Sequence, residues 1–338
     1  MPVKRLAIIG AGSWGTALGI VAARAEHQVR LWSHNEDVAA EINAKHLNTR
    51  YLALPVVVPQ NIFATCDLND ALSEALIVIL ASPSHVTREL CERMLPFLRP
   101  EMIFVSATKG IEVGTGKRIS QILSEVVGEK FEPRFVCLSG PSFAQEVAAG
   151  QPTAIVAASV CEDDSRLIQS ALSFDNLRVY TNTDVIGTEL CGSVKNVMAV
   201  AAGMVAGLGF GTNSVAAIIT RGLAEIARLA LAQGANLETM MGLAGMGDLV
   251  LTCTGALSRN RFVGQELGRG RALPDIVKGM HEVAEGVKTA RAVKFLADQL
   301  RIEMPITNEV YAVLYEGKKA RDAAYELMNR PLRVEFER

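Results

Sequence analysis

Lys195 is the side chain of this sequence whose surroundings best suit proton transfer. It falls in an apolar helical segment, and its neighbours at helical spacing are Cys191, Gly192, Met198 and Ala199, none of which is a carboxylate. A lysine on such a face either extends its ammonium to water or is partly desolvated. Desolvation lowers the pKa of an ammonium towards neutrality, as a proton-transferring lysine requires. The helical pattern alone leaves both roles open.

A glycine motif at the start of the chain has the spacing of a pyrophosphate-binding turn. Gly10-Ala11-Gly12-Ser13-Trp14-Gly15 follows the apolar run Leu6–Ile9 and opens a helical pattern. In such a GxGxxG turn Gly10 permits the tight bend, Gly12 admits the pyrophosphate and Gly15 allows close packing of helix and strand. The free N–H groups at the helix start favour an anion. We therefore expect a nicotinamide dinucleotide here, although an ordinary glycine turn is the alternative.

The end of the second expected strand bears on which dinucleotide binds. NAD-specific folds place Asp or Glu there to hold the ribose 2′-hydroxyl. This chain has Ser33-His34-Asn35, and Glu36 and Asp37 are expected to begin the next helix after an Asn35 N-cap. The missing carboxylate leaves NADP possible, and His34 is either a ligand or a surface histidine.

Further polar residues follow other expected strands and open later helices. Lys109 stands beside a glycine after the run Ile103–Ser106, at the sheet edge where ligands bind in open α/β folds. In the second half, the glycine turn at 245–248 presents Asp248, and Ser258 is a candidate N-cap for a helix that begins with Arg259. An arginine at a helix start can hold a phosphate, and an ordinary capped helix is the alternative.

Composition describes an ordinary globular chain. The 338 residues are 49% hydrophobic and 21% charged, and the net charge of −2 gives no reason to bind nucleic acid or an anionic membrane. The N-terminal run to Ala23 carries spaced glycines that a signal peptide does not need, and the apolar run 197–211 is too short for a membrane span. Six scattered cysteines suit a reducing compartment, and no metal-ligand cluster appears. We expect a cytoplasmic protein.

Two architectures follow each other along the chain. Strand-like apolar runs alternate with helical patterns in the first half, which predicts a doubly wound Rossmann-type sheet, and only helical periodicity follows it. The predicted domains are 1–188 for dinucleotide binding and 189–338, all helical, for substrate binding. The expected strands are Leu6–Ile9, Val29–Trp32, Leu76–Leu80, Ile103–Ser106, Phe135–Leu138, Ala154–Ala158 and Leu177–Thr181.

With these residues in view, the chain resembles the bacterial NAD(P)-dependent glycerol-3-phosphate dehydrogenases along nearly its whole length. Several segments typical of this family occur in the same order along the chain, which identifies the family more specifically than any single motif. They are GAGSWGTAL from Gly10, the Ala107–Gly110 turn, SGPSFAQEVAAGQPTA from Ser139, ELCGSVKN from Glu189, ITRGLAEIARL from Ile219, GLAGMGDLVLTCT from Gly242 and SRNR from Ser258.

The resemblance implies reversible reduction of dihydroxyacetone phosphate to sn-glycerol 3-phosphate, which supplies phospholipid synthesis, by a homodimer that uses NADP(H) or NAD(H) and no metal. It implies that Lys195 is the proton donor and acceptor. Substrate contacts are implied for Lys109, Gly140, Ser142, Lys195, Asp248, Ser258, Arg259 and Asn260. Dinucleotide contacts, with the motif glycines Gly10, Gly12 and Gly15, are implied for Ser13, Trp14, His34, Lys109, Ala144, Arg259, Val283 and Glu285.

Two other functions remain as alternatives. Another β-hydroxyacid-type dehydrogenase could share the two-domain plan, and a panel of substrates would separate the two activities. A dinucleotide-sensing protein would bind NADPH without turnover, but it gives no reason for Lys195, Asp248 and Arg259 to occur together.

Overall fold

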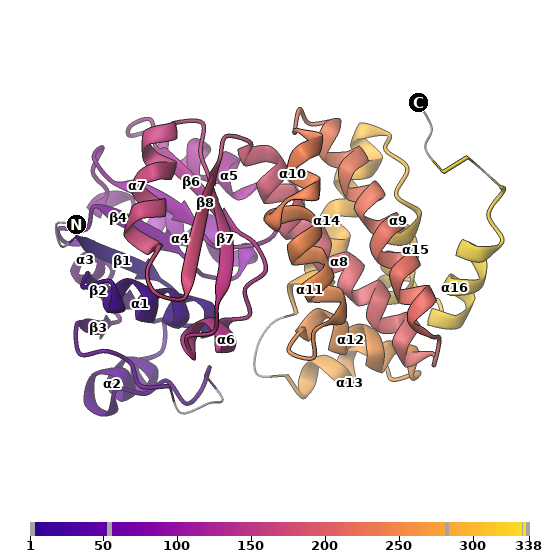
Figure 1. The fold of residues 1–338 in the computed structure, drawn as a ribbon, viewed down its shortest axis with the longest axis horizontal. Helices are drawn as coiled ribbons and strands as arrows, with labels where there is room; N and C mark the ends of the chain where they lie inside the picture. The colour runs from indigo at the N-terminus through magenta and orange to yellow at the C-terminus, as the bar shows by residue number, and fades with distance from the viewer. Residues whose placement is uncertain (1–3, 53–55, 281–283, 333, 336–338) are drawn as a thin grey trace.

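The computed structural model describes residues 4–52, 56–280, 284–332 and 334–335. The first half of the chain forms a layered α/β unit and the second half a helical unit beside it, as Figure 1 shows. The two units are joined by the long helix α8 (Val185–Gly207), which starts at the sheet and crosses the helical unit.

One eight-stranded sheet forms the core of the α/β unit. Its strand order is β3-β2-β1-β4-β5-β6-β7-β8, and all neighbouring pairs are parallel except β6 and β7. This order confirms the predicted doubly wound Rossmann-type sheet. The strands are β1 (Arg5–Ile9), β2 (Gln28–Trp32), β3 (Ile62–Thr65), β4 (Ile77–Leu80), β5 (Ile103–Ser106), β6 (Arg134–Ser139), β7 (Thr153–Ala158) and β8 (Leu177–Asn182).

The edge strand β3 is not among the strands predicted from the sequence. Its side chains alternate between buried and exposed, with Phe63 45% exposed, so it lacks the continuous apolar run by which the central strands were found. The central strand β4 shows the contrast, because all four of its residues are buried between helices on both faces of the sheet.

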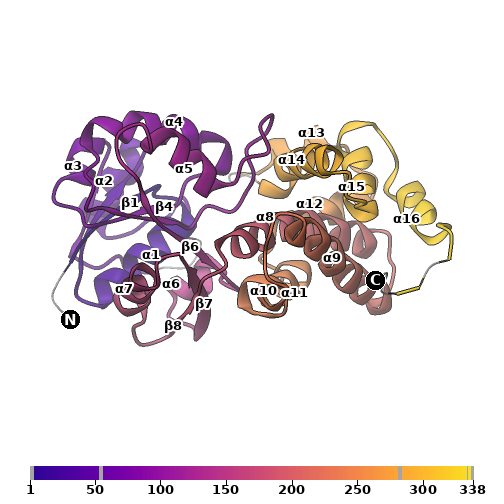
Figure 2. The ribbon, with the colours of Figure 1, turned by 90° about the horizontal axis from the view of Figure 1, so that it is seen from above.

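Helices cover both faces of the sheet, as the view from above shows (Figure 2). Apolar side chains of α1, α2, α6 and α7 pack on one face, and those of α3, α4 and α5 pack on the other. The bounds are α1 (Ser13–Arg24), α2 (Glu36–Lys45), α3 (Leu68–Leu72), α4 (Thr87–Met94), α5 (Ile119–Val127), α6 (Ala144–Ala148) and α7 (Glu162–Leu172), with short 3₁₀ turns η1 (Ser84–Val86) and η2 (Leu95–Phe97) around α4.

Helix α8 is the core of the helical unit. Helix α12 (Arg259–Gly268) packs so closely on it that a Cβ at Gly203 would lie 2.1 Å from the carbonyl oxygen of Arg261, and one at Gly264 would lie 2.0 Å from that of Val200. The other helices surround this pair. They are α9 (Thr212–Leu231), α10 (Leu237–Met241), the π-helical turn η3 (Leu243–Gly247), α11 (Asp248–Thr254), α13 (Leu273–Lys278), α14 (Glu285–Leu300), α15 (Pro305–Tyr315) and α16 (Ala320–Met328).

Helix α8 is also long and apolar enough to span a membrane by composition, but 89% of its most apolar window is buried inside the protein. Its apolar character therefore serves the core of the helical unit. Its N-cap, Asp184, accepts hydrogen bonds from the backbone N–H of Gly187 and, from α10, the Thr239 hydroxyl. The predicted boundary at residue 188 falls within the first turn of this helix.

Candidate functional site

The glycine motif forms the turn between β1 and α1. Gly10 has φ of +126°, and a Cβ there would lie 2.7 Å from the carbonyl oxygen of Ala81. A Cβ on Gly15 would lie 1.9 Å from the carbonyl oxygen of Gly10, so this glycine allows the helix to approach the turn. A Cβ on Gly12 would meet nothing within 4 Å, which leaves its backbone open to a ligand. Gly10 and Gly15 therefore have the steric roles that the motif predicted, and the space at Gly12 leaves room for a ligand.

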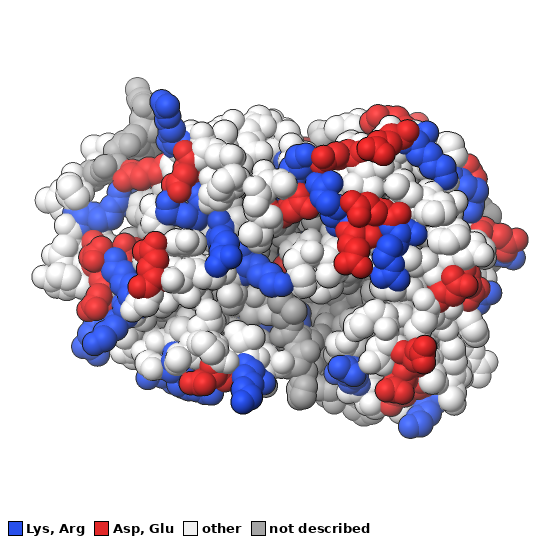
Figure 3. Space-filling view, turned by 180° about the vertical axis from the view of Figure 1, so that it is seen from behind, with Lys and Arg blue, Asp and Glu red and all other residues white. Residues whose placement is uncertain are grey.

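A cavity of about 640 Å³ begins at this turn and extends between the two units. Both halves of the chain contribute to its walls. A hollow between the units is visible in Figure 3, where basic and acidic side chains alternate over the surrounding face. The lining includes the expected residues Gly10, Gly12, Ser13, Trp14, His34, Lys109, Ser142, Ala144, Lys195, Ser258, Arg259, Asn260 and Glu285.

The cavity walls fit a dinucleotide. The buried indole N–H of Trp14 and the buried hydroxyl of Ser82 have no hydrogen-bond partner among the described residues, and both residues line the cavity. Such unpaired buried groups are costly unless a ligand bonds to them. The N-terminus of α1 has no side-chain cap, so its N–H groups are available to a pyrophosphate.

Lys195 lies on α8 with its ammonium facing α11. The Lys195 Nζ is 2.6 Å from Oδ1 of Asp248 and 2.7 Å from the hydroxyl oxygen of Thr252, and the side chain is only 7% exposed. Of the two possibilities left by the sequence, desolvation is confirmed. Burial lowers the pKa of Lys195 to about 8, although the attraction of Asp248 opposes the shift.

Asp248 binds a second lysine from the other unit. Lys109, in the loop after β5, places its Nζ 2.7 Å from Oδ2 of Asp248 and donates to the carbonyl oxygen of Gly140 at 3.2 Å. One buried carboxylate therefore holds two ammonium groups, one on each of its oxygens. Lys109 also helps to lower the pKa of Lys195 through charge repulsion.

A chain of side-chain hydrogen bonds supports the same wall of the cavity. The Asn260 amide donates to Oδ1 of Asn196 at 2.9 Å and accepts from the backbone N–H of Gly286, also at 2.9 Å. Glu285, the first residue of α14, accepts a 2.6 Å hydrogen bond from the Ser84 hydroxyl of the sheet unit. These bonds connect α8, α12 and α14 and join the two units across the cavity.

The start of α12 has the geometry that the sequence predicted. Ser258 is the N-cap and accepts a hydrogen bond from the backbone N–H of Arg261 at 3.2 Å. Arg259 follows as the first residue of the helix and lines the cavity. An arginine and the N-terminus of a helix therefore lie together on the cavity wall, where they can bind an anionic group.

The ribose end of the cavity includes Ser33 and His34. Ser33 is 1% exposed, and its hydroxyl donates to the carbonyl oxygen of Asn35 at 2.9 Å, whereas His34 is exposed. Asn35 caps α2, as expected, by accepting from the backbone N–H of Val38. Of the residues that follow β2, His34 therefore presents an exposed side chain at the cavity.

Some expected site residues lie outside the cavity lining. Gly15 packs behind the glycine turn, Gly140 contributes its carbonyl oxygen to Lys109, and Asp248 holds both lysines. Val283 lies outside the residues that the structure describes. The segment before Asp248 was expected to interrupt the helices as a glycine turn, but it is helical and continues into α11. It is the π-helical turn η3, in which the N–H of Gly247 donates to the carbonyl oxygen of Gly242.

Thr252 and Asn196 are site residues that the sequence reading missed. Thr252 accepts from Lys195 and donates to the backbone carbonyl of Asp248 at 2.6 Å. Its position four residues after Asp248, on the same helix face, is a signal that could have identified it. Asn196 directly follows Lys195, but only the packing of α12 shows that it bonds to Asn260.

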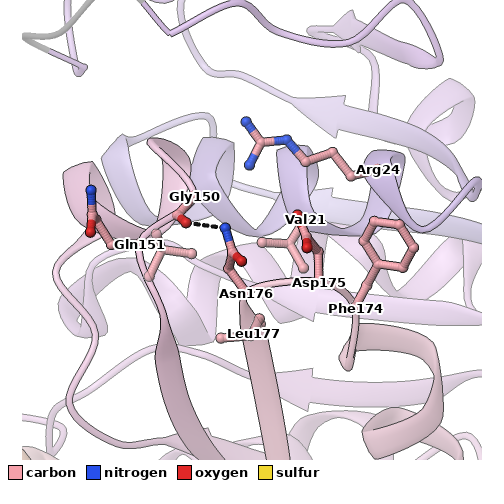
Figure 4. Close-up of a pocket in the computed structure, with 9 residues that line it drawn as sticks. Val21, Arg24, Gly150, Gln151, Phe174, Asp175, Asn176 and Leu177 are labelled. Atoms are coloured by element: carbon pink, nitrogen blue, oxygen red, sulfur yellow. Dashed lines mark hydrogen bonds between the residues drawn. The ribbon is translucent and has the colours of Figure 1, made fainter.

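A second hollow is far too small for a dinucleotide. Its volume is about 10 Å³, room for a single water, and it lies where α1 meets the loop before β8 (Figure 4). There Asn176 donates to the carbonyl oxygen of Gly150, as Figure 4 shows. The Arg24 guanidinium donates to the carbonyl oxygen of Ala148. These bonds join α6 and the residues after it to α1 and to the loop before β8.

The fold and the cavity together define a dinucleotide-dependent dehydrogenase with a Rossmann unit, a helical unit and its reaction site between them. Family models confirm this class and narrow it. Residues 5–165 match the model of the NAD-dependent glycerol-3-phosphate dehydrogenase N-terminus, and residues 184–325 match that of its C-terminus. The chain belongs to the NAD-dependent glycerol-3-phosphate dehydrogenase family.

Individual relatives are similar in sequence to this chain along nearly its whole length. The chain is 53% identical to a glycerol-3-phosphate dehydrogenase [NAD(P)+] of Koribacter versatilis and 48% identical to one of Myxococcus xanthus, in each case over 98% of this chain and 99% of the relative. The crystal structure of glycerol-3-phosphate dehydrogenase from Coxiella burnetii superposes with a TM-score of 0.93 at 40% identity, covering 97% of this chain and 99% of that one.

Proposed function

We propose that the protein reversibly reduces dihydroxyacetone phosphate to sn-glycerol 3-phosphate with NADPH or NADH, and so supplies glycerophospholipid synthesis. The observation that carries the proposal is Lys195, a buried ammonium with a pKa of about 8 on the wall of the cavity that starts at the glycine turn. The relatives that match over almost their entire length, named glycerol-3-phosphate dehydrogenase [NAD(P)+], support it.

In this proposal the residues of the chain position the substrate and supply a proton. Gly10, Gly12, Ser13 and Trp14 hold the dinucleotide, which supplies the hydride when bound. Lys195 neutralises negative charge on the substrate oxygen and donates its proton to it.

Asp248 and Thr252 position the Lys195 ammonium, and burial keeps its pKa within reach of physiological pH. In the oxidative direction the neutral amine takes the proton back. Asp248 also holds Lys109, which we place against the substrate with Gly140 and Ser142.

The substrate phosphate has its own proposed site at the start of α12. Ser258, Arg259 and Asn260 combine a cation with the N–H groups of a helix N-terminus. Fixing the phosphate there would orient the carbonyl group towards Lys195, and orientation of this kind can supply several kcal/mol of a reaction barrier, about 7–11 in the best cases. Ala144, Glu285, Val283 and His34 complete the proposed dinucleotide contacts.

The direct test is oxidation of NADPH with dihydroxyacetone phosphate as the only added substrate, followed by the loss of absorbance of the reduced nicotinamide. We expect substrate-dependent turnover and formation of sn-glycerol 3-phosphate. The control substrates are ketopantoate and the 2-oxo acid that forms when mandelate is oxidised. They are chosen because ketopantoate reductase and D-mandelate dehydrogenase share the fold at 13–17% identity. Turnover of a control and not of the phosphorylated ketone would refute the substrate, and NADPH binding without any turnover would favour a dinucleotide sensor.

Three further proposals accompany this function. The chain divides functionally near the start of α8, with residues 1–188 binding the dinucleotide and 189–338 the substrate. The protein acts in the cytoplasm, without inserting into membranes or binding nucleic acid. It forms a homodimer, which light scattering after size-exclusion chromatography tests directly, since a dimer would have twice the 36.3 kDa of the chain.

A further inference from the structure

Arg93 is a cavity-lining cation with no part in the function proposed above. Four Lys and Arg residues line the cavity in the part of the chain that the structure describes. Lys109 and Lys195 share Asp248, and Arg259 stands at the start of α12. Arg93 comes instead from the last turn of α4, in the sheet unit.

Its guanidinium lies over the aromatic ring that ends β2. The guanidinium carbon of Arg93 is 5.6 Å from the centroid of the Trp32 ring, and the residues that follow Trp32, Ser33 and His34, line the same cavity. The indole N–H of Trp32 is bonded to the carbonyl oxygen of Cys66, so the ring is held in place. In a Rossmann fold the ribose 2′ position of the bound dinucleotide lies at this strand end.

The charges around Arg93 leave it able to accept a phosphate. Its side chain is 51% exposed, and its ion pair with Glu89 on the same helix is long, at 3.7 Å, and exposed on both sides. Exposed pairs of this kind are weak, so the guanidinium can exchange one anion for another. A guanidinium that is stacked on an aromatic ring still presents a planar fork that matches a phosphate.

No carboxylate competes from β2 itself. Ser33 is buried and bonded to the backbone of Asn35, while Glu36 and Asp37 belong to the first turn of α2 and are not among the residues that line the cavity. Of the four Lys and Arg residues that line the cavity in the described part of the chain, Arg93 is therefore the one that lies beside the end of β2.

We propose that Arg93 binds the 2′-phosphate of NADP(H), stacked on Trp32, and thereby sets the preference for NADP(H) over NAD(H). The proposal rests on the proposed function only in that the cavity must hold a dinucleotide. It assigns the selectivity to helix α4, outside the loop after β2 where such residues are usually sought.

The test is calorimetric titration of the whole protein with 2′,5′-ADP and with 5′-AMP, which differ only in the 2′-phosphate. The parent protein should bind 2′,5′-ADP at least tenfold more tightly. Arg93→Ala should lose most of this ratio through weaker binding of 2′,5′-ADP, and Arg93→Lys should lose less. In turnover, Arg93→Ala should raise KM for NADPH far more than KM for NADH.

The matched control is Arg166→Ala, which removes an exposed arginine from a similar i,i+4 pair with Glu162 on α7, outside the cavity lining. It should leave both affinities within twofold of the parent. Equal losses of 2′,5′-ADP and 5′-AMP affinity in Arg93→Ala would overturn the proposal, and so would an unchanged ratio. These titrations contain no substrate, so they test Arg93 separately from the proposed activity. If the titrations contradict the role of Arg93 while dihydroxyacetone phosphate is still reduced with NADH, only the role of Arg93 is refuted. If the titrations give the expected ratios but dihydroxyacetone phosphate is not reduced, only the proposed activity is refuted.

Discussion

Replacing Lys195 by Met tests the central step of the proposed reaction. The substitution keeps most of the aliphatic volume but removes the proton and the charge, and Asp248 keeps Lys109 as a partner at 2.7 Å. General acid–base groups contribute about 10²–10⁴-fold to turnover. We therefore expect kcat for dihydroxyacetone phosphate reduction to fall by about 10²–10⁴, with NADPH binding retained.

The structure also sets the pH at which the parent enzyme should lose activity. Burial lowers the pKa of Lys195 from 10.5 to about 8, a change that corresponds to about 3 kcal/mol against the charged form. The reductive reaction needs the protonated lysine, so its kcat/KM should decline above a pH of about 8. The oxidative reaction needs the neutral amine, so its rate should rise as the pH increases towards the same value.

Lys109→Met is the companion variant, because Lys109 lowers the pKa of Lys195 by repulsion. Removing that repulsion should move the alkaline limb of the reductive profile to higher pH. The assay is steady-state oxidation of NADPH between pH 6 and 10, with NADPH binding followed separately by fluorescence. Turnover of Lys195→Met within a few-fold of the parent, or a parent profile flat through pH 9, would refute the assignment.

Three further predictions concern the anion sites and the helical core. Arg259→Ala should raise KM for dihydroxyacetone phosphate, since charge-assisted bonds to a desolvated anion contribute roughly 1.5–3 kcal/mol each; an unchanged KM would place the phosphate elsewhere. The parent should use NADPH at least as well as NADH, and His34→Asp should shift relative kcat/KM towards NADH by about tenfold, or 1.4 kcal/mol; an NADH preference above tenfold in the parent would contradict our view of this strand end. Burial raises the pKa of Glu225 from 4.5 to about 7, so its stabilising contribution is full below pH 4.5 and is lost as the pH rises through 7. Urea unfolding at pH 5.5 and 8.5 should show this loss in the parent and a smaller one in Glu225→Gln, and equal pH dependence in both would contradict it.

The sheet could be predicted from the sequence because its central strands are continuous apolar runs between helical patterns. Parallel strands buried on both faces require such runs, and β4 is an example. The edge strand β3 and the π-helical turn before Asp248 could not be predicted in this way. Strand β3 spans four residues whose side chains alternate between buried and exposed, so it has no continuous apolar run. The glycines at 245–247 indicated a turn that interrupts the helices, whereas in the structure they lie in a π-helical turn.

The functional site likewise has features that the sequence predicted and features that it did not. Local geometry is a property of short segments, and the sequence therefore predicted the glycine turn at Gly10–Gly15, the Asn35 cap of α2 and the Ser258 cap of α12. Each of these depends on hydrogen bonds and steric limits between residues a few positions apart.

For Lys195, the sequence indicated an apolar helical face and therefore a side chain whose pKa could be lowered by burial. The packing of α8 against α11 buries this ammonium and makes Asp248, 53 residues further on, its partner. Contacts between other distant segments bring Lys109 to the same carboxylate and Arg93 to the end of β2. Burial and charge pairing depend on which distant segments pack against each other in the folded protein, and residue spacing along the chain does not specify those contacts.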